Sequence, residues 1–174
     1  NDKVKTRLNT YYTKFQSKQD LLTISGNPYN DLFQQNFKRI EDQTEWKINP
    51  SLNSIIGFGW STENVNSSRY DNIDSAKTNT IQYAFNQWEW NNGKKWLANA
   101  GFRFDQNQNF ASAFSPKFSL MYKVNTQLRF KLSAGRGFKA PDFRQLYLNF
   151  TNAAAGSYSV FGAVEAQKVI NRLM

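Results

Sequence analysis

Apolar and polar residues alternate along several stretches of the chain, most clearly in two neighbouring ones. Between positions 114 and 124 the even-numbered residues are apolar, whereas Lys117, Ser119 and Lys123 lie at odd positions. Between 128 and 135 the apolar residues are again even-numbered, and Arg129 and Lys131 are odd-numbered. Successive residues of a β-strand point to opposite faces, so the pattern predicts two strands that each have one apolar and one polar face.

Five more stretches predict strands of the same kind: 4–12, 37–48, 52–60, 81–90 and 96–105. Two of them are irregular. Asp42 interrupts the apolar face of 37–48, and in 81–90 the apolar phase slips between Phe85 and Trp88, which predicts a bulge or an interface. The chain is therefore expected to form about seven strands.

The connections between these strands alternate in length. Residues 49–50, 91–93 and 123–126 form tight turns, whereas 26–31, 61–77 and 106–111 are longer and polar. Short turns on one rim and long loops on the other are typical of outer-membrane barrels, whose walls separate lipid from an aqueous lumen. The predicted fold class is all-β: an antiparallel up-and-down meander forming a partial segment of a large transmembrane β-barrel, with a short C-terminal helix over 163–173.

Tryptophans near the expected strand ends fit the aromatic girdle of such a barrel, with packing in a soluble core as the alternative. They are Trp46, Trp60, Trp88, Trp90 and Trp96.

Composition narrows the possible functions. The chain has 22 Lys and Arg against 13 Asp and Glu, a net charge of +9 that suggests an anionic partner. It has no basic run, zinc-finger spacing or RNA-binding aromatic box, so a nucleic-acid partner is not predicted. With no Cys and no His, we predict no metal site, no cofactor and no enzyme activity. The first residues are neither an initiator nor a signal peptide, and we expect a fragment of a longer protein.

Much of the positive charge lies on the polar faces of the predicted strands. The lumen-facing basic residues are Lys3, Lys5, Arg7, Arg39, Lys47, Arg103, Lys117, Lys123, Arg129 and Lys131. A confined basic surface attracts anions such as a metal chelate. Alternatively, these side chains pair with carboxylates of further strands and of a plug domain, whose close approach Gly57, Gly59, Gly101 and Gly135 would permit.

The last predicted strand leads into a distinctive turn that reads GRGFKAP and is followed by Leu146 and Tyr147. This segment resembles the barrel signature of TonB-dependent outer-membrane receptors, with Lys139 where Arg is more usual. The matching residues are Gly135, Arg136, Gly137, Phe138, Lys139, Ala140, Pro141, Leu146 and Tyr147. We expect them to be structural: the glycines permit close packing or positive φ, Pro141 sets the exit direction, and the aromatic residues pack under an extracellular loop.

The resemblance implies a bacterial outer-membrane location and energy-coupled uptake of a scarce nutrient, typically a ferric siderophore, through a plugged barrel of about 22 strands. It also implies membrane lipid around the outer face, a plug domain, and a TonB-type energy transducer that acts through an upstream region. Residues 1–174 would be a partial barrel domain without the plug and the remaining strands. Haem receptors of this family carry a Phe-Arg-Ala-Pro box, then an iron-binding His and an Asn-Pro-Asn-Leu box. Here His is absent and no Asn-Pro-Asn-Leu box follows Pro141, so haem is disfavoured as the ligand.

Two other classes of function remain open at this stage. A passive or structural outer-membrane barrel would share the alternation, but not the turn at 135–141. A soluble basic β-protein that binds an anionic polymer would instead bury its even-numbered apolar residues in a core.

Overall fold

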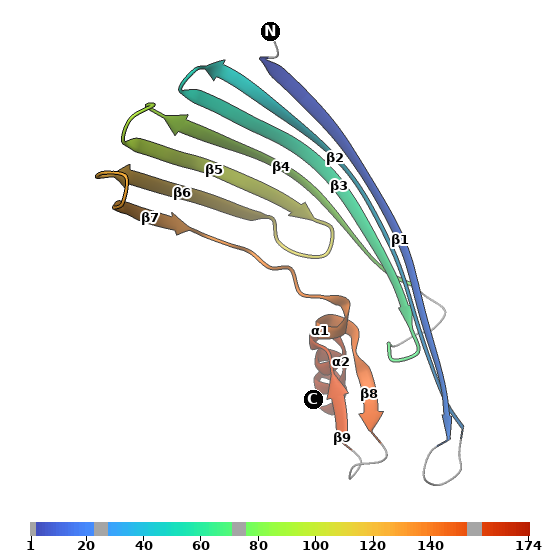
Figure 1. Cartoon of the computed structure of the whole chain (residues 1–174). Helices are drawn as coiled ribbons and strands as arrows, with labels where there is room; N and C mark the ends of the chain where they lie inside the picture. The colour runs from blue at the N-terminus through green and yellow to red at the C-terminus, as the bar shows by residue number, and fades with distance from the viewer. Residues whose placement is uncertain (1–2, 23–27, 71–75, 153–157) are drawn as a thin grey trace. The chain divides into compact units, whose positions relative to one another are not determined.

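The computed structural model describes residues 3–22, 28–70, 76–152 and 158–174. Within these ranges one sheet contains seven strands in chain order, with β1 and β7 at its two edges (Figure 1). The strands are β1 (Val4–Leu22), β2 (Pro28–Asn49), β3 (Leu52–Ser67), β4 (Lys77–Asn91), β5 (Trp96–Asn107), β6 (Ala113–Lys123) and β7 (Arg129–Gly135). The predicted meander is confirmed, including its tight turns between β2 and β3, β4 and β5, and β6 and β7.

Strand pairing keeps the even-numbered side chains on one face of the sheet and the odd-numbered side chains on the other. Strands β4 to β7 pair antiparallel, and each register joins residues of the same parity. The β4–β5 register is unbroken over 81–91, so no bulge interrupts this pairing. Tyr83 and Phe85 lie on the polar face with the odd-numbered residues, whereas Trp88 and Trp90 lie on the apolar face.

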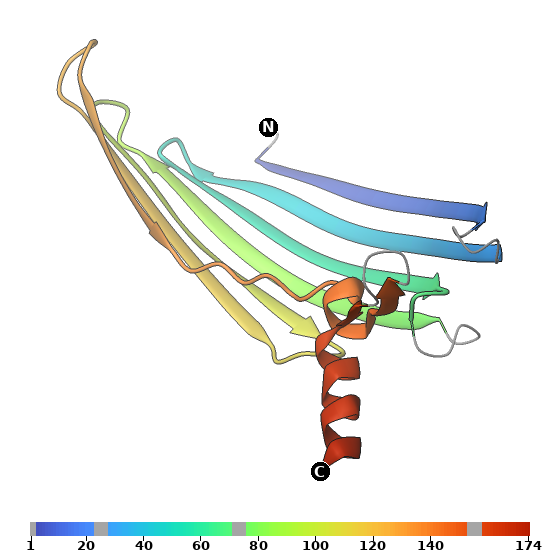
Figure 2. The same cartoon turned by 90° about the horizontal axis from the view of Figure 1, so that it is seen from below.

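The apolar face of β6 and β7 is bare. Phe118, Phe130 and Leu132 keep 45%, 60% and 66% of their surface exposed, and Leu120 is half-buried. Strands β5 to β7 lie side by side in a single layer in both views (Figures 1 and 2). These side chains are therefore not sealed in a core among the described residues, which contradicts the reading as a soluble protein.

Contacts divide the chain into two compact units. Unit 1 comprises Asn1–Tyr11, Lys38–Thr62 and Thr80–Lys139, and unit 2 comprises Tyr12–Phe37, Glu63–Asn79 and Ala140–Met174. Strands β1 to β4 contribute to both units because they are longer than predicted. Strand β2 has 22 residues, whereas about 9–11 residues suffice to cross a bilayer.

Two of the predicted long loops are therefore partly strand. Residues 28–31 belong to β2 and residues 61–67 belong to β3, while 26–27 and 71–75 lie outside the described residues. Likewise β5 continues to Asn107, past the start of the loop expected at 106–111.

Unit 2 also contains α1 (Phe143–Tyr147), β8 (Asn149–Asn152), β9 (Tyr158–Phe161) and α2 (Ala163–Leu173). Helix α2 has the bounds predicted from the sequence. Helix α1 begins at a capping box, in which Asp142 Oδ1 accepts from the backbone N–H of Gln145 at 2.8 Å and the Gln145 side chain accepts from that of Asp142 at 3.0 Å. No helix among the described residues has the length and apolar character needed to cross a membrane.

Candidate functional site on the polar face of the sheet

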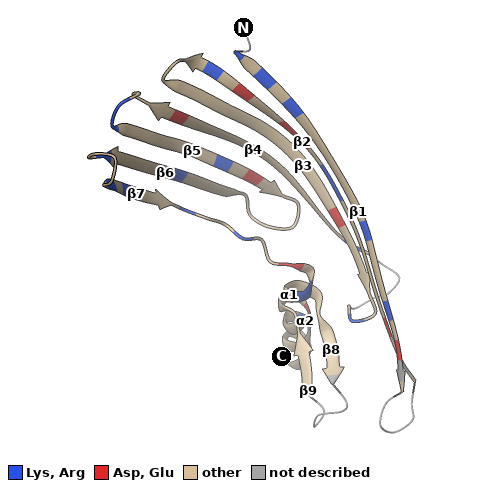
Figure 3. Cartoon of the chain, viewed as in Figure 1, with Lys and Arg blue, Asp and Glu red and all other residues tan. Residues whose placement is uncertain are grey.

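The ten predicted basic residues all belong to unit 1 and have odd numbers. Lys3 directly precedes β1, and the other nine lie on β1, β2, β5, β6 and β7 (Figure 3). The registers place Arg103 opposite Ser115, and Lys117 between Gly101 and Gly135 on the same face. On β5 to β7 the predicted basic residues therefore share one face of the sheet.

A chain of polar contacts crosses this face from β5 to β2. Arg103 Nη2 lies 2.7 Å from Asp105 Oδ1, and the Arg103 guanidinium lies 3.8 Å from the centroid of the Tyr83 ring. The Tyr83 hydroxyl donates a hydrogen bond to Glu41 Oε2. One cation is thus held by a carboxylate and by an aromatic face, an attraction worth about 0.5–1 kcal/mol at an exposed site.

Tyr83 reaches Glu41 because β3 has glycines beneath the rings of β4. A Cβ atom on Gly59 would clash with the Tyr83 ring, and one on Gly57 would clash with the Phe85 ring. The space above both glycines is therefore filled by the chain's own aromatic side chains. The expectation that Gly57 and Gly59 leave room for a plug is wrong, because Phe85 and Tyr83 already occupy that room.

A cavity of about 570 Å³ lies in unit 1 beside the end of β7. Arg103, Lys117 and Arg136 line it together with Glu41, so its charged lining has three cations and one carboxylate. On each neighbouring strand the residue paired with Lys117 is a glycine, Gly101 on β5 and Gly135 on β7. Such a hollow can accept the oxygens of an anionic ligand through charge-assisted hydrogen bonds.

Two glycines of this cavity wall are constrained by neighbouring backbone. A Cβ on Gly101 would lie 2.8 Å from the carbonyl oxygen of Asn86, and one on Gly135 would lie 3.2 Å from that of Pro116. Both therefore allow close packing against a neighbouring strand, which was expected of Gly135, whereas approach of a plug at Gly101 stays a prediction. A Cβ on Gly137 would meet nothing within 4 Å, and the only described glycine with positive φ is Gly93, at 72°. Of the two alternatives expected, close packing is found at Gly135, and neither close packing nor positive φ is found at Gly137 among the described residues.

The rest of the signature is divided between the two units. Lys139 is the last residue of unit 1, and Ala140 is the first of this part of unit 2. Phe138 is half exposed, so it does not pack as expected. Leu146 is buried in α1.

The aromatic residues of α1 lie in the small core of unit 2. Phe143 packs with Val65 and Tyr70, and the Tyr147 ring lies 6.5 Å from the Tyr70 ring. Burial, reinforced by the Asp142 carboxylate, raises the pKa of Tyr70 from 10.0 to about 12. Tyr147 therefore packs against Tyr70 in the connector between β3 and β4, and the extracellular position of this connector stays a prediction.

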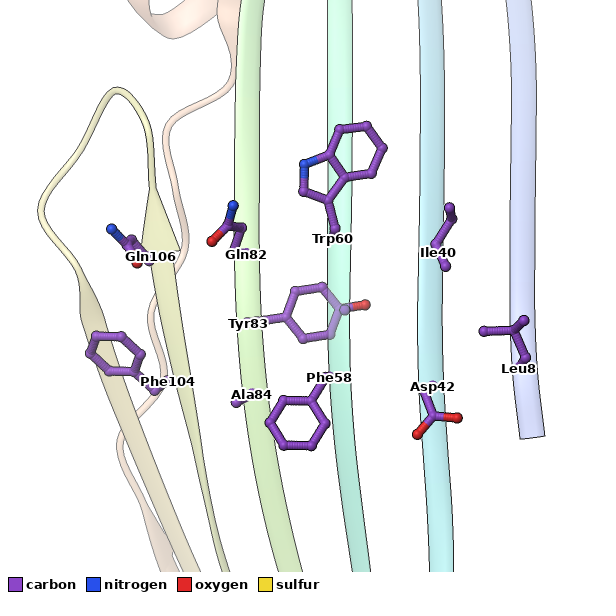
Figure 4. A pocket seen from close by; sticks show the side chains of 11 residues that line it. Leu8, Ile40, Asp42, Phe58, Trp60, Gln82, Tyr83, Ala84, Phe104 and Gln106 are labelled. Carbon is purple, nitrogen blue, oxygen red and sulfur yellow. The ribbon is translucent and has the colours of Figure 1, made fainter. Parts of the chain in front are cut away.

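The opposite, apolar face carries a second hollow of about 610 Å³ that spans β1 to β5 (Figure 4). Leu8, Ile40, Phe58 and Phe104 contribute apolar side chains from four different strands. Asp42 lies among them, as the sequence indicated, and accepts a long hydrogen bond from Thr44 at 3.5 Å. The arrangement is a mostly apolar surface interrupted by the polar side chains of Asp42, Gln82 and Gln106 rather than a catalytic site.

Metal ligands do not gather anywhere in the described part of the chain: no group of three or more His, Cys, Asp or Glu lies close enough to hold an ion. Asp71 and Asp74, whose spacing supplies too few oxygens for a calcium site by itself, lie outside the described residues.

The sequence pattern did not predict that Tyr83 links Arg103 to Glu41. It placed Tyr83, together with Phe85, in the apolar phase of its strand. The available signal was the pair Gly57 and Gly59, two residues apart on β3, combined with Tyr83 and Phe85, two residues apart on β4. Rings packed over glycines of a neighbouring strand are a known device of β-sheets.

Comparison with known proteins agrees with this architecture. The family described as TonB dependent receptor-like, beta-barrel matches residues 1–171. "Vitamin B12 transporter BtuB" of Vibrio cholerae is 32% identical over 129 residues, which is 72% of this chain and 20% of that protein. The protein of the same name from Photobacterium profundum is 23% identical over 105 residues, which is 60% of this chain and 17% of that protein.

A solved structure has a similar fold. The siderophore receptor PirA from Pseudomonas aeruginosa superposes with a TM-score of 0.61 at 14% identity, covering 90% of this chain and 34% of that one. The chain thus spans about a fifth of the length of the curated relatives. The matching family is described as receptor-like and the sequence relatives are named as transporters, so the expectation of a non-enzyme is confirmed. The chain belongs to the TonB-dependent receptor β-barrel family of the bacterial outer membrane.

Proposed function

We propose that residues 1–174 are part of the barrel domain of a receptor that actively imports an anionic metal chelate, most simply a ferric siderophore. The parent protein supplies the remaining strands and a plug domain, and a TonB-type transducer supplies energy through an upstream segment. The observation that carries the proposal is the cavity beside β7, which Arg103, Lys117 and Arg136 line together.

Charge is the reason for preferring an anionic ligand. The even-numbered face of β5 to β7 is mainly apolar, whereas the odd-numbered face of these strands carries Arg103, Lys117, Lys123, Arg129 and Lys131. Low-dielectric walls focus the field of such a surface and raise the local concentration of anions. A ferric catecholate or citrate complex is anionic, and its oxygens can accept hydrogen bonds from guanidinium and ammonium groups.

A corrinoid is the second candidate, because the chain is 32% identical to a part of a vitamin B12 transporter. Cyanocobalamin is neutral overall, so the positive charge of the cavity would contribute little to its binding. The two candidates therefore differ in how strongly the affinity depends on the cavity cations and on salt.

Ligand binding to the full-length receptor in detergent separates these candidates. We expect an anionic ferric chelate to bind, and Arg103→Gln combined with Lys117→Gln to weaken its binding at least tenfold. Lys14→Gln combined with Lys38→Gln removes the same charge from even-numbered positions and should leave the affinity within about twofold. Unchanged affinity in the cavity variant would overturn the assignment of the site.

Cobalamin binding without chelate binding would favour the corrinoid.

Import into cells without the energy transducer is the second experiment. Import that continues in them would support a passive barrel instead of a coupled receptor.

A further inference from the structure

The hollow that spans β1 to β5 on the apolar face, called here the outer hollow, contains a carboxylate (Figure 4). Leu8 and Phe58 line the outer hollow with large apolar side chains that stay exposed. Asp42 is half-buried beside them, and no described Lys or Arg lies within ion-pair distance of it. Its hydrogen bond from Thr44, at 3.5 Å, is long. The outer hollow therefore offers an acceptor for a cation that the described part of one chain does not supply.

Asp42 lies within the part of β2 that crosses the bilayer. Strand β2 ends at Asn49, before a tight turn, and a crossing of about 9–11 residues from there reaches about position 39–41. Ile40 and Trp46 share the even-numbered face with Asp42. A carboxylate that faces hydrocarbon is costly, and ionisable residues inside a membrane generally pair with an opposite charge. Lipid headgroups lie outside the hydrocarbon core, so a protein side chain is the cation that can reach this depth.

The chain itself carries such a cation beside the outer hollow. Lys38 is exposed and lies on β2, four residues from Asp42 and on the same face, with Ile40 between them. Strands of a barrel are tilted by about 35–45°, so two copies of β2 that face each other in one membrane cross. A two-fold axis beside a crossing point at Ile40 brings Asp42 of each copy towards Lys38 of the other. The long aliphatic stem of lysine extends along the apolar surface and spans the remaining distance.

We propose that the outer hollow is the contact surface between two copies of the receptor in the outer membrane, with Asp42 of each copy paired to Lys38 of the other. Leu8, Ile40 and Phe58 are exposed and supply the apolar contacts around the two ion pairs. The contact lies on the opposite face from the basic cavity beside β7, so it does not depend on which nutrient the receptor imports.

Charge complementarity is the reason for choosing a second copy as the occupant. The same patch of β2 carries both signs, the carboxylate of Asp42 and the ammonium group of Lys38. In a contact that uses the same patch on both copies, each charge meets its opposite. A different partner that brings a single cation would pair with Asp42 alone and gain nothing from Lys38.

Energy transfer between donor-labelled and acceptor-labelled copies of the full-length receptor in liposomes tests this proposal. We expect the wild type to associate, and Asp42→Lys and Lys38→Asp each to weaken association roughly tenfold or more, because like charges then face each other in the contact. In a mixture of the two variants, the cations of one copy face the carboxylates of the other. The mixture should therefore regain association to within about threefold of the wild type, which an ion pair within one chain would not produce.

The matched control is Lys94→Asp, which reverses the same charge in the exposed turn between β4 and β5 and should leave association unchanged. The neutral variants Asp42→Asn and Lys38→Gln should each weaken association about threefold, which keeps the test valid if a charge reversal fails to fold. Monomers at every protein-to-lipid ratio, variants that associate like the wild type, or folded variants that fail to associate in the mixture would overturn the proposal.

A spin label at position 10, beside Leu8 on the same strand face, tests lipid as the other occupant. We expect oxygen to reach this label less in the wild type than in Asp42→Lys, because a second copy covers the outer hollow. Equal access in both would mean that lipid covers the outer hollow, and would reject the contact between copies.

Discussion

Gly59 shows how one missing side chain organises the polar face. The ring of Tyr83 lies where a Cβ of Gly59 would be, and from there its hydroxyl reaches Glu41 on β2 while Arg103 stacks on the ring. A methyl group at position 59 must displace the ring. Strands β2, β4 and β5 are therefore linked through the space above Gly59, a residue to which the alternation of apolar and polar residues assigns no role.

We expect Gly59→Ala to destabilise the full-length barrel by about 1–3 kcal/mol, the usual cost of overpacking. Gly137→Ala is the matched control and should be close to neutral, since a Cβ there meets nothing and φ is not positive. Urea unfolding in detergent, followed by the heat-modifiable shift in gel mobility, measures both. Equal stabilities of the two variants would show that the ring is not held over Gly59.

A double-mutant cycle isolates the cause. Once Tyr83→Ala has removed the ring, Gly59→Ala should cost much less than it does in the wild type. Additive effects of the two substitutions would mean that the glycine is needed for another reason.

At the scale of elements, the helix α1 depends on its N-cap. Asp142→Ala removes the acceptor for the backbone N–H of Gln145 and should cost about 1 kcal/mol locally. Asp142→Asn keeps an acceptor in the same place and should cost only a few tenths. Hydrogen exchange of the α1 amides measures the difference. Faster exchange in both variants alike would point to the charge of Asp142 rather than to the cap.

Unit 2 should loosen at strongly alkaline pH because of Tyr70. Its pKa is raised from 10.0 to about 12, chiefly by burial. The unfolded chain loses this proton near pH 10, whereas the folded chain retains it, so the stabilising contribution is complete below pH 10 and is lost between pH 10 and 12. Limited proteolysis at pH 9 and pH 11 should detect cleavage at the β3–β4 connector only at the higher pH.

Tyr70→Phe has no proton to lose, so the increase in cleavage should be smaller in this variant. Absorbance of tyrosinate should also show that wild type has one more late-titrating group than Tyr70→Phe. A wild type and a variant that loosen identically would assign the transition to another group.

Element boundaries show where prediction from sequence reaches its limit. The pattern located all seven wall strands, but it ended the first one at Tyr12 and the third at Trp60, whereas β1 continues to Leu22 and β3 to Ser67. Apolar and polar residues alternate only where one face of a strand is apolar and the other is polar. A strand that extends beyond the bilayer has water on both faces, so its sequence does not alternate. Helix α2 was predictable from residue preferences alone, whereas the five residues of α1 and the short β8–β9 pair are held by tertiary contacts.

The candidate site was only half predictable for a similar reason. Parity placed Arg103 and Lys117 on one face correctly. It could not foresee that Arg136, read as part of a structural signature, lines the same cavity, since the chain leaves the sheet at Gly135. Nor could it foresee aromatic rings that lie across a neighbouring strand.

At the scale of the whole molecule, contact with lipid explains the exposed apolar surface. Strands β1 and β7 are unpaired edges of the described sheet, and Phe130 and Leu132 are bare. We expect the isolated 174-residue chain to aggregate or to require detergent, because unpaired strands and large apolar patches associate in water. Analytical ultracentrifugation with and without detergent checks this, and a detergent-free monomer with two-state unfolding would speak against it.

The most direct test measures which face of β6 and β7 meets hydrocarbon. The chain has no native cysteine, so single cysteines can be introduced along 117–123 and 129–135 of a cysteine-free full-length receptor in liposomes and spin-labelled. We predict a period of two: labels at even positions such as 118, 120, 130 and 132 are accessible to oxygen, and labels at odd positions are accessible to a water-soluble nickel complex. Accessibility without that period, or nickel access at the even positions, would contradict the account.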